Sequence, residues 1–316
     1  MPVLYANQIG TLAAQALDSD EGATVGEIIA TFAHSFYVKT RDDQLLFFTN
    51  QSFHSPITVN VPYSGSFTDV IKPLEPLYVN GRRLYNSNLT IEFTNNPQPA
   101  KKKVSINNNP NYVNLTNASN LLSTILNVIE TAGSVLDRDQ LTVHDSIANF
   151  VKEGILPLRT KEDLSKFAAA ASEIIGLGSG FTPSGDDFLL GFLVIYNSLA
   201  RVVARTPIYI ELEQLTQRTN WISAKLVDYA QHLQLDEHLR LVVQTISNRY
   251  GDIVMALETL IPRGHTSGID ITTGASFGLS VACDIALGQR KTEVIATKLG
   301  FQCLDSPTAR ELILNP

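Results

Sequence analysis

The chain has 316 residues, of which 44% are hydrophobic and 17% charged, and its formal net charge is -7. These proportions are typical of a compact globular protein with room for two domains, and they argue against a disordered chain. The acidic balance argues against a nucleic-acid partner, because binding to phosphate backbones needs clustered Lys and Arg.

Cysteine content and hydropathy favour a cytoplasmic protein without membrane contact. Only Cys283 and Cys303 are present, which argues against a disulfide framework and favours a reducing compartment. The longest apolar run, Phe188 to Ile195, is far shorter than the roughly 20 residues that a membrane span needs. The first residues show no basic segment followed by an apolar core, so we expect no secretion signal.

Strand-like segments fill the first part of the chain. They are short, rich in branched and aromatic residues, and separated by Gly, Pro and Asn. They cover Glu27–Lys39, Gln44–Thr49, Ile57–Val61, Leu77–Val79 and Leu89–Phe93. We therefore predict that residues 1–95 form a β-rich domain, a small antiparallel barrel or sandwich.

Helical periodicity dominates the second part. Residues 96–118 are rich in Asn, Pro and Lys and read as a linker or long loop. Apolar residues then recur with helical spacing from Leu121 to Ile129 and in later segments, which predicts a mainly α-helical domain over 119–316. The later segments are His144–Glu153, Lys161–Ile175, Asp187–Val203, Glu211–Leu233, Asp236–Leu260 and Asp270–Leu287. The expected fold class is α+β.

The most informative motif runs from Gly176 to Asp187, with the sequence GLGSGFTPSGDD, directly before an apolar run. Glycines admit turns and close ligand approach, and Thr, Ser and Asp before an apolar run mark a helix start. A glycine loop that leads into a helix N-terminus favours an anion such as phosphate or a carboxylate. A tight helix–helix connection is the simpler alternative, but such a connection needs only one Gly and one capping residue.

Two familiar nucleotide motifs do not fit this loop. A Walker A loop ends in Gly-Lys-Ser/Thr, and no Lys occurs between Gly176 and Asp187. A dinucleotide fingerprint needs a third glycine where Phe181 stands, and a preceding strand where a helical pattern is found.

The pattern S-G-x-D-x-x-x-G occurs twice. The first copy begins at Ser184 and ends at Gly191, and the second begins at Ser267 and ends at Gly274. Each copy opens an apolar helix, so the repeat predicts either two facing helix N-termini that share a ligand or a coincidence of capping preferences.

Several side chains near the two copies are candidates for chemistry. Asp186 and Asp187 point about 100° apart on a helix, so we expect one to face the ligand and the other to cap or brace a neighbour. Mg²⁺ is a possible partner of such carboxylates, but the pattern does not demand it. His265 follows Gly264 and precedes two hydroxyl residues, which favours proton transfer or hydrogen bonding over a plain surface loop, while Arg263 can meet an anion. Thr219 and Ser223 share one helix face and either line a site or face solvent.

The order of these motifs resembles that of the AllH family. The resemblance rests on Gly176–Leu189, Arg218–Ala224 and Gly264–Asp270, and more weakly on Ala33–Phe36 and Ser55–Ile57. It extends from about Gly26 to Leu287. Phe181 stands where the family commonly has Leu, and Asn220-Trp221-Ile222 interrupts a run of small and hydroxyl residues.

The resemblance implies a subunit of oxamate carbamoyltransferase in allantoin (purine) catabolism. Such an enzyme moves a carbamoyl group between oxalurate and phosphate to give oxamate and carbamoyl phosphate. The resemblance also implies a hetero-oligomer with an FdrA-like subunit and a third protein. Two alternatives remain: a non-catalytic anion-binding or scaffold subunit, and a Mg-dependent phosphotransferase.

Motifs and resemblance together give one set of expected site residues. Asp186, Asp187, His265 and Asp270 are the expected catalytic residues, with a carboxylate on the carbamoyl NH₂. The expected groups for binding phosphate, carbamoyl phosphate or oxamate are Gly178, Ser179, Gly180, Thr182, Ser184, Gly185, Thr266, Ser267 and Gly268. No cofactor is expected apart from a possible Mg²⁺.

Overall fold

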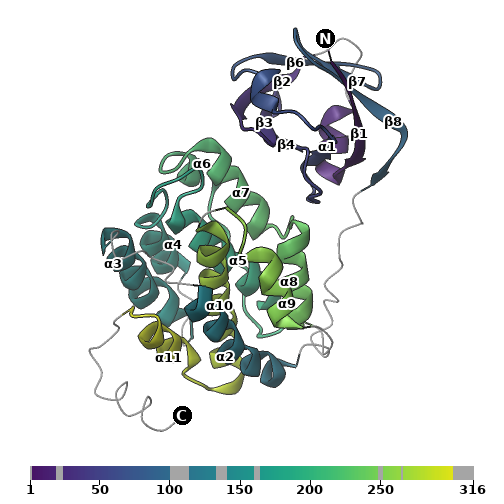
Figure 1. Ribbon diagram of the computed structural model, residues 1–316. Helices are drawn as coiled ribbons and strands as arrows, with labels where there is room; N and C mark the ends of the chain where they lie inside the picture. The colour runs from purple at the N-terminus through teal and green to yellow at the C-terminus, as the bar shows by residue number, and fades with distance from the viewer. Residues whose placement is uncertain are drawn as a thin grey trace. The chain divides into compact units, whose positions relative to one another are not determined.

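A computed structural model describes residues 2–18, 24–99, 114–132, 141–159, 164–247, 252–264 and 266–301. The chain forms two compact units. The first comprises residues 1–104 with the short segment 234–237, and the second comprises 105–233 with 238–316. Figure 1 shows the strands of the first unit and the helices of the second, and each unit is described on its own.

The first unit is a closed eight-stranded barrel. Its elements are β1 (Val3–Ile9), α1 (Thr11–Leu17), β2 (Thr24–Thr31), β3 (Ser35–Thr40), β4 (Leu45–Thr49), β5 (Thr58–Asn60), a 3₁₀ turn (Phe67–Asp69), β6 (Pro76–Asn80), β7 (Arg83–Tyr85) and β8 (Thr90–Pro99). The strand order around the barrel is β1-β5-β4-β3-β2-β6-β7-β8.

The barrel is mixed, so the prediction of an antiparallel sheet is wrong in this respect. Six of the strand pairs are antiparallel, but β1 pairs with β8 and β4 pairs with β5 in parallel. Because β4 and β5 are parallel, the chain cannot join them by a tight turn. The segment between Thr49 and Thr58 crosses from the end of β4 back along that strand to the start of β5. Pairing of the first and last strands closes the barrel and leaves no sheet edge.

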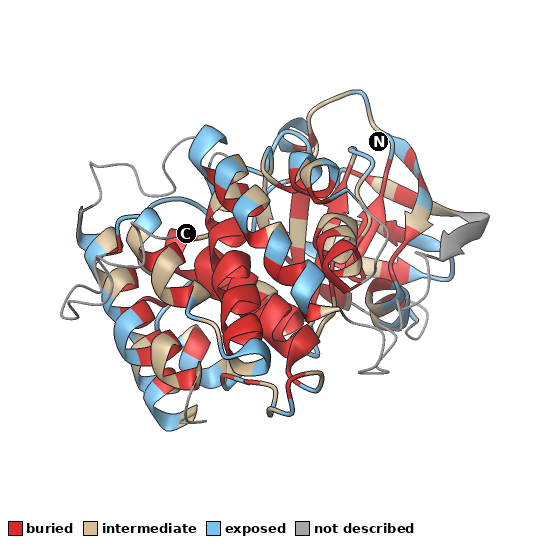
Figure 2. Cartoon of the chain, turned by 90° about the horizontal axis from the view of Figure 1, so that it is seen from below, coloured by how far each residue is buried: buried red, intermediate tan, exposed pale blue. Residues whose placement is uncertain are grey.

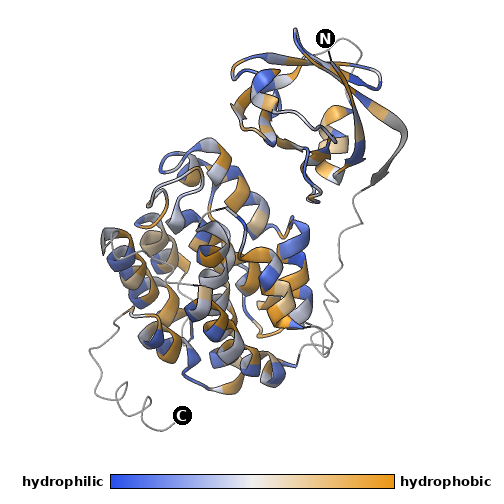
Figure 3. Ribbon diagram, viewed as in Figure 1, coloured by the Kyte–Doolittle hydropathy of each residue, from blue (hydrophilic) through white to orange (hydrophobic). Residues whose placement is uncertain are grey.

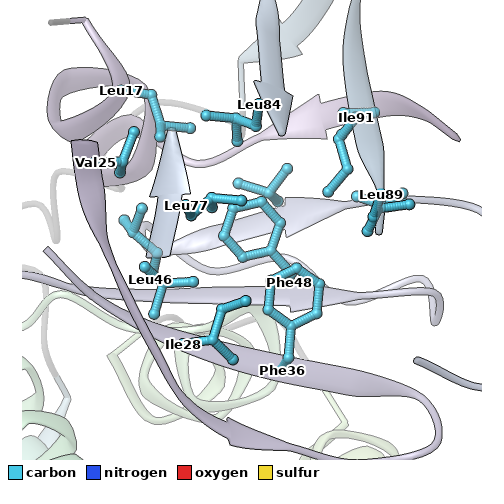
Figure 4. Close-up of a cluster of buried hydrophobic side chains, with 14 of the residues drawn as sticks. Leu17, Val25, Ile28, Phe36, Leu46, Phe48, Leu77, Leu84, Leu89 and Ile91 are labelled. Carbon is cyan, nitrogen blue, oxygen red and sulfur yellow. The ribbon is translucent and has the colours of Figure 1, made fainter. Parts of the chain in front are cut away.

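Inward-facing apolar side chains fill the barrel (Figure 4). Alternate residues of each strand point inward, as in β3, where Phe36 and Val38 are fully buried. The rings of Phe36 and Phe48 stack with their centroids 4.5 Å apart across β3 and β4. This packing holds the strands in register, because a slip of one residue would turn the apolar set outward.

The strand predictions differ from the structure in two places. The segment predicted as one strand, Glu27–Lys39, is the hairpin of β2 and β3, whose strands are joined by residues 32–34. The first strand β1, with its alternating burial, and the short strand β7 have no counterpart among the predicted segments.

The second unit is helical. Its elements are α2 (Leu115–Ala132), α3 (Leu141–Phe150) with a π turn (Val151–Ile155) and a 3₁₀ turn (Leu156–Arg159), α4 (Leu164–Ser172), α5 (Ser184–Leu199), α6 (Leu212–Thr216), α7 (Trp221–Gln231), α8 (Glu237–Ser247), α9 (Ile253–Leu260), α10 (Ser267–Leu287) and α11 (Lys291–Lys298). Figure 3 shows hydrophobic and hydrophilic residues alternating around α8 and α9, as expected for helices with one buried face. No helix in the described ranges is long and apolar enough to cross a membrane.

Helices α5 and α10 form the centre of this unit. Every residue of α5 is buried, and so are most residues of α10; buried residues are red in Figure 2. The two helices run parallel, because Gly191 meets Ile271, Gly274 meets Phe188 and Gly278 meets Phe192. A Cβ atom at Gly191 would lie 1.9 Å from the Ile271 carbonyl oxygen, and one at Gly274 would lie 1.9 Å from the Phe188 carbonyl oxygen. The last glycine of each sequence repeat therefore permits direct contact between the two backbones.

Two long helical predictions are each divided in the structure. Glu211–Leu233 comprises α6 and α7, which Asn220 separates by capping α7 with its side chain. Asp236–Leu260 comprises α8 and α9, and residues 248–251 between them lie outside the described ranges. Most of the predicted linker, 96–118, also lies outside the described ranges, between β8 and α2.

Candidate functional site

The glycine-rich segment connects α4 to the start of α5, and its first glycines are required by packing. Gly176 and Gly178 have φ values of 79° and 110°, which disfavour any residue with a side chain. A Cβ atom on Gly176 would lie 2.1 Å from the Arg218 carbonyl oxygen, and one on Gly178 would lie 2.7 Å from the Ser184 amide nitrogen. These two positions hold the loop against its neighbours, whereas Gly180 is exposed and a Cβ atom there would make only an ordinary contact, 3.7 Å from the Thr182 carbonyl oxygen.

In both S-G-x-D copies the glycine amide donates to a carbonyl group of the segment before the helix. Gly185 donates its N–H to the Leu177 carbonyl at 2.9 Å, and Gly268 donates its N–H to the Arg263 carbonyl at 3.0 Å. A Cβ atom on either glycine would collide with carbonyl oxygens of the preceding helix or turn. Both copies therefore begin a helix with the glycine packed against preceding backbone. The residues before the helices differ, since Pro183 is extended with a ψ of 144°, whereas Thr266 has a ψ of -20°.

The two copies meet at their first turns. The Thr182 and Ser267 hydroxyl oxygens are 2.9 Å apart, although the residues are separated by 85 positions. Thr182 also donates to Asp187 Oδ2 at 3.0 Å. The start of α5 and the start of α10 are thus joined through hydroxyl groups that lie beside a carboxylate.

Asp186 is a bracing residue. Its carboxylate accepts hydrogen bonds from the Gly176 amide at 2.7 Å, the Thr219 hydroxyl at 2.5 Å and the Ser223 hydroxyl at 2.6 Å. Burial raises the pKa of Asp186, while these three donors lower it. Asp186 therefore fastens the start of α5 to the start of α7, and its hydrogen-bonding capacity is largely used within the protein.

Asp187 points to a different set of partners from those of Asp186, as expected for adjacent positions on a helix. Only 4% of its surface is exposed. Burial raises its pKa to about 6, although the Ser267 and Thr182 hydroxyls and the positive charge of Arg263 lower it. Near neutral pH this carboxyl group exchanges between its charged and neutral forms.

Asp270 is the counterpart of Asp187 in the second copy. It is 1% exposed, and neither carboxylate oxygen has a hydrogen-bond partner among the described residues. Burial raises its pKa to about 7, and the charge of Asp187 raises it further, against the opposing influence of the Ser184 and Thr266 hydroxyls. Each aspartate thus faces the serine of the other copy: Asp187 is influenced by Ser267, and Asp270 by Ser184.

The remaining expected site residues are divided between buried positions, exposed positions and positions outside the described ranges. Ser184 and Gly268 are buried at the helix starts, whereas Ser179, Gly180 and Thr266 are exposed. His265, the expected proton-transfer residue, lies outside the described ranges.

Two features of the site go beyond the sequence reasoning. Thr219 and Ser223, for which solvent exposure was an open alternative, both donate to Asp186. The prediction that they share one helix face is wrong, because α7 begins at Trp221 and Thr219 precedes its cap. Asn220 donates from Nδ2 to the Phe181 carbonyl at 3.0 Å and accepts from the Ser223 amide. The two positions that depart from the AllH pattern are therefore in contact. Within the described ranges, no group of three or more His, Cys, Asp or Glu residues is arranged to hold a metal ion.

These elements define a class of site: two parallel helices whose N-terminal turns enclose a pair of buried, mutually repelling carboxyl groups. The family model described as oxamate carbamoyltransferase subunit AllH matches residues 174–279. That span begins before the glycine-rich loop and ends in α10, so it includes both S-G-x-D copies and the Asp186 partners Gly176, Thr219 and Ser223. No solved structure matches the chain.

Proposed function

We propose that this chain is a carbamoyltransferase subunit in which Asp187 and Asp270 carry out proton transfer on a small ureido or carboxylate substrate. The observation that carries the proposal is the pair itself: two buried carboxyl groups, with pKa values of about 6 and about 7, at two helix starts joined through Thr182 and Ser267. The AllH match over the same residues supports the reaction class.

Two nearby carboxyl groups with raised pKa values disfavour the state in which both are charged. The charge of Asp187 contributes to the raised pKa of Asp270, so the pair favours one neutral and one charged member. A neutral carboxyl group donates a proton, and a carboxylate accepts one, which are the two roles of general acid–base catalysis.

The proposed reaction needs both roles. In the transfer of a carbamoyl group from oxalurate to phosphate, a phosphate oxygen forms a bond to the carbamoyl carbon. The bond between that carbon and the oxamate nitrogen breaks, and this nitrogen takes up a proton. We assign the neutral Asp270 carboxyl group to proton donation to the leaving nitrogen, and the Asp187 carboxylate to the carbamoyl NH₂ or the phosphate proton. His265 remains a proposed contributor to proton transfer or oxyanion contact.

Recognition of the anion falls to groups other than the carboxylates. The N-terminal ends of α5 and α10 carry positive partial charge, and Arg263 is close enough to lower the pKa of Asp187. We propose that these groups, with Ser179, Gly180 and Thr266 at the exposed rim, contact phosphate or the carboxylate of oxamate. Mg²⁺ would have to use the same carboxylates, and the proposed mechanism does not require it.

A pH–rate profile of the assembled subunits tests the proposal. These would be this chain, the proposed FdrA-like subunit and the proposed third protein, with carbamoyl phosphate formation from oxalurate and phosphate as the assay. We expect kcat/KM to depend on two ionisations near neutral pH, and Asp270→Asn to remove one of them. Asp145→Asn, at an exposed position on α3, is the matched control and should keep both. An unchanged profile in Asp270→Asn would reject the assignment.

A scaffold or anion-binding role is the second candidate, and one observation favours it. The amides of Gly185 and Gly268 already donate to carbonyl groups of this chain, so fewer helix-start amides remain for a substrate. Isothermal titration of the isolated chain with phosphate, carbamoyl phosphate and oxamate separates the candidates. Ligand binding that persists in Asp187→Asn and Asp270→Asn, with unchanged activity of the assembled complex, would favour the non-catalytic role.

A further inference from the structure

A concave site lies on the barrel unit, outside its apolar core. It is a pocket of about 490 Å³, which falls within the usual range for small-molecule sites. Its walls come from the end of β1, the segment after β4 and the end of β5. Asn60 lines it next to Val59, which belongs to the barrel core, so the pocket lies on the outer side of this strand.

The lining is unusual in its chemistry. Of the eight described residues around the pocket, five carry carboxamide side chains: Asn7, Gln8, Asn50, Gln51 and Asn60. The other three are a serine, a histidine and a proline. Each carboxamide offers both a donor and an acceptor, so the lining matches a ligand that also presents both.

Asn60 provides an unmet hydrogen-bonding group in this pocket. It is 6% exposed, it pairs with Gln8 across β1 and β5, and its Nδ2 donates to Gln8 Oε1 at 3.1 Å. Its own Oδ1 is buried without a hydrogen-bond partner in the described part of the chain. If the carboxamides of Asn60 and Gln8 were both turned by 180°, Gln8 would donate to Asn60, and the Asn60 NH₂ group would be the buried group without a partner. In either orientation one polar end of Asn60 lacks a partner among the described residues.

The pocket favours an uncharged ligand. No described lining residue carries a permanent charge, and His54 Nδ1 is 3.1 Å from Glu237 Oε2, a carboxylate within the same compact unit. An ionic ligand would lose hydration here without gaining a counter-charge. Asn50 donates to the Tyr63 carbonyl at 2.8 Å, which fixes one wall before any ligand arrives.

We propose that this pocket binds a small uncharged molecule that carries carboxamide or ureido groups, with the lining carboxamides, Asn60 among them, as its hydrogen-bond partners. Such groups are planar and present N–H donors and a carbonyl acceptor together, so they complement a lining of Asn and Gln side chains. The proposal is independent of the carboxylate pair between α5 and α10, which belongs to the other compact unit.

Ligand-observed NMR on the full chain, with malonamide and biuret as probes, tests this site. Malonate is the matched charged analogue of malonamide, and glycerol represents hydroxyl ligands. We expect saturable binding of malonamide or biuret with a Kd on the order of 1 mM. Asn60→Ala should weaken it about tenfold, the effect of one lost hydrogen bond.

Two further variants guard against a folding defect. Gln51→Ala changes an exposed lining residue and should also weaken binding, whereas Asn80→Ala changes an exposed barrel asparagine outside the pocket and should not. The proposal would be overturned if neither amide probe bound, if malonate bound equally well, or if glycerol were preferred. Full binding by both Asn60→Ala and Gln51→Ala would also overturn it. Carbamoyl transfer by the same variants is measured in parallel, so failure of one proposal is distinguishable from failure of the other.

Discussion

Replacement of Gly274 by alanine tests the parallel packing of α5 and α10. The new Cβ atom would lie 1.9 Å from the Phe188 carbonyl oxygen, whereas real Cβ atoms essentially never approach a heavy atom within 3.0 Å. The helices must therefore separate locally by roughly 1 Å, and a gap of this size forfeits a quarter to a half of each dispersion contact that it opens.

The expected cost follows from that displacement. Overpacking a buried site costs about 1–3 kcal/mol, and we expect the upper end because the obstacle is backbone rather than a flexible side chain. The higher helix propensity of alanine offsets about 0.5–1 kcal/mol of this cost. The net loss in the free energy of unfolding should therefore be about 2 kcal/mol.

Urea unfolding followed by the fluorescence of Trp221, the sole tryptophan, reports on the helical unit. Gly191→Ala should cost as much as Gly274→Ala, since its Cβ atom would meet the Ile271 carbonyl at the same distance. The double variant should cost less than the sum, because one separation relieves both collisions.

Gly288→Ala is the control for these substitutions. Gly288 ends α10 with a φ of 64° and has nothing within 4 Å of the site of a Cβ atom, so its replacement should cost about 1 kcal/mol from backbone strain alone. The contact between the α5 and α10 backbones would be refuted if Gly274→Ala were no more destabilising than Gly288→Ala. It would also be refuted if the costs of Gly191→Ala and Gly274→Ala were fully additive.

Two further predictions concern the buried carboxyl groups. The folded-state pKa values of Asp187 and Asp270, about 6 and about 7, exceed the ordinary value of 3.8, so the folded protein holds more protons than the unfolded chain between these limits. Their contribution to stability is therefore fully present below about pH 4 and is lost as the pH rises through 7. In urea midpoints measured between about pH 5 and 8, Asp270→Asn should flatten this decline, and an unchanged slope would contradict the raised pKa. Asp186→Ala should lower the free energy of unfolding by at least about 3 kcal/mol, since it deprives Gly176, Thr219 and Ser223 of a charged acceptor. A loss below about 1 kcal/mol by the same fluorescence assay would show that the three hydrogen bonds do not brace the helices.

Local sequence signals predicted much of the helical unit and of the site. The S-G-x-D repeat indicated two helix starts, and the contact between Thr182 and Ser267 brings them together. The spacing of Thr219 and Ser223 predicted one shared helix face, whereas Thr219 precedes α7, and their common partner Asp186 is 33 and 37 positions away. Spacing along one helix carries no information about such a distant acceptor.

Long-range pairing limited the prediction of the barrel. Alternating residues identify a strand, but they do not say whether its neighbour is parallel, so the β1–β8 and β4–β5 pairs were missed. The same limit applies to the pair Asp187 and Asp270. Each was a candidate from its own motif, while their mutual influence on pKa depends on the packing of Gly191 and Gly274.

The most direct test of the proposed acid–base pair is a double-variant cycle on carbamoyl transfer in the assembled complex. Asp187→Asn and Asp270→Asn should each lower kcat by at least about 100-fold, the contribution of a positioned acid or base. The double variant should be little worse than either single variant, because an acid and a base that serve one proton transfer act as a unit. Full activity in either single variant, or losses that multiply in the double variant, would contradict the account.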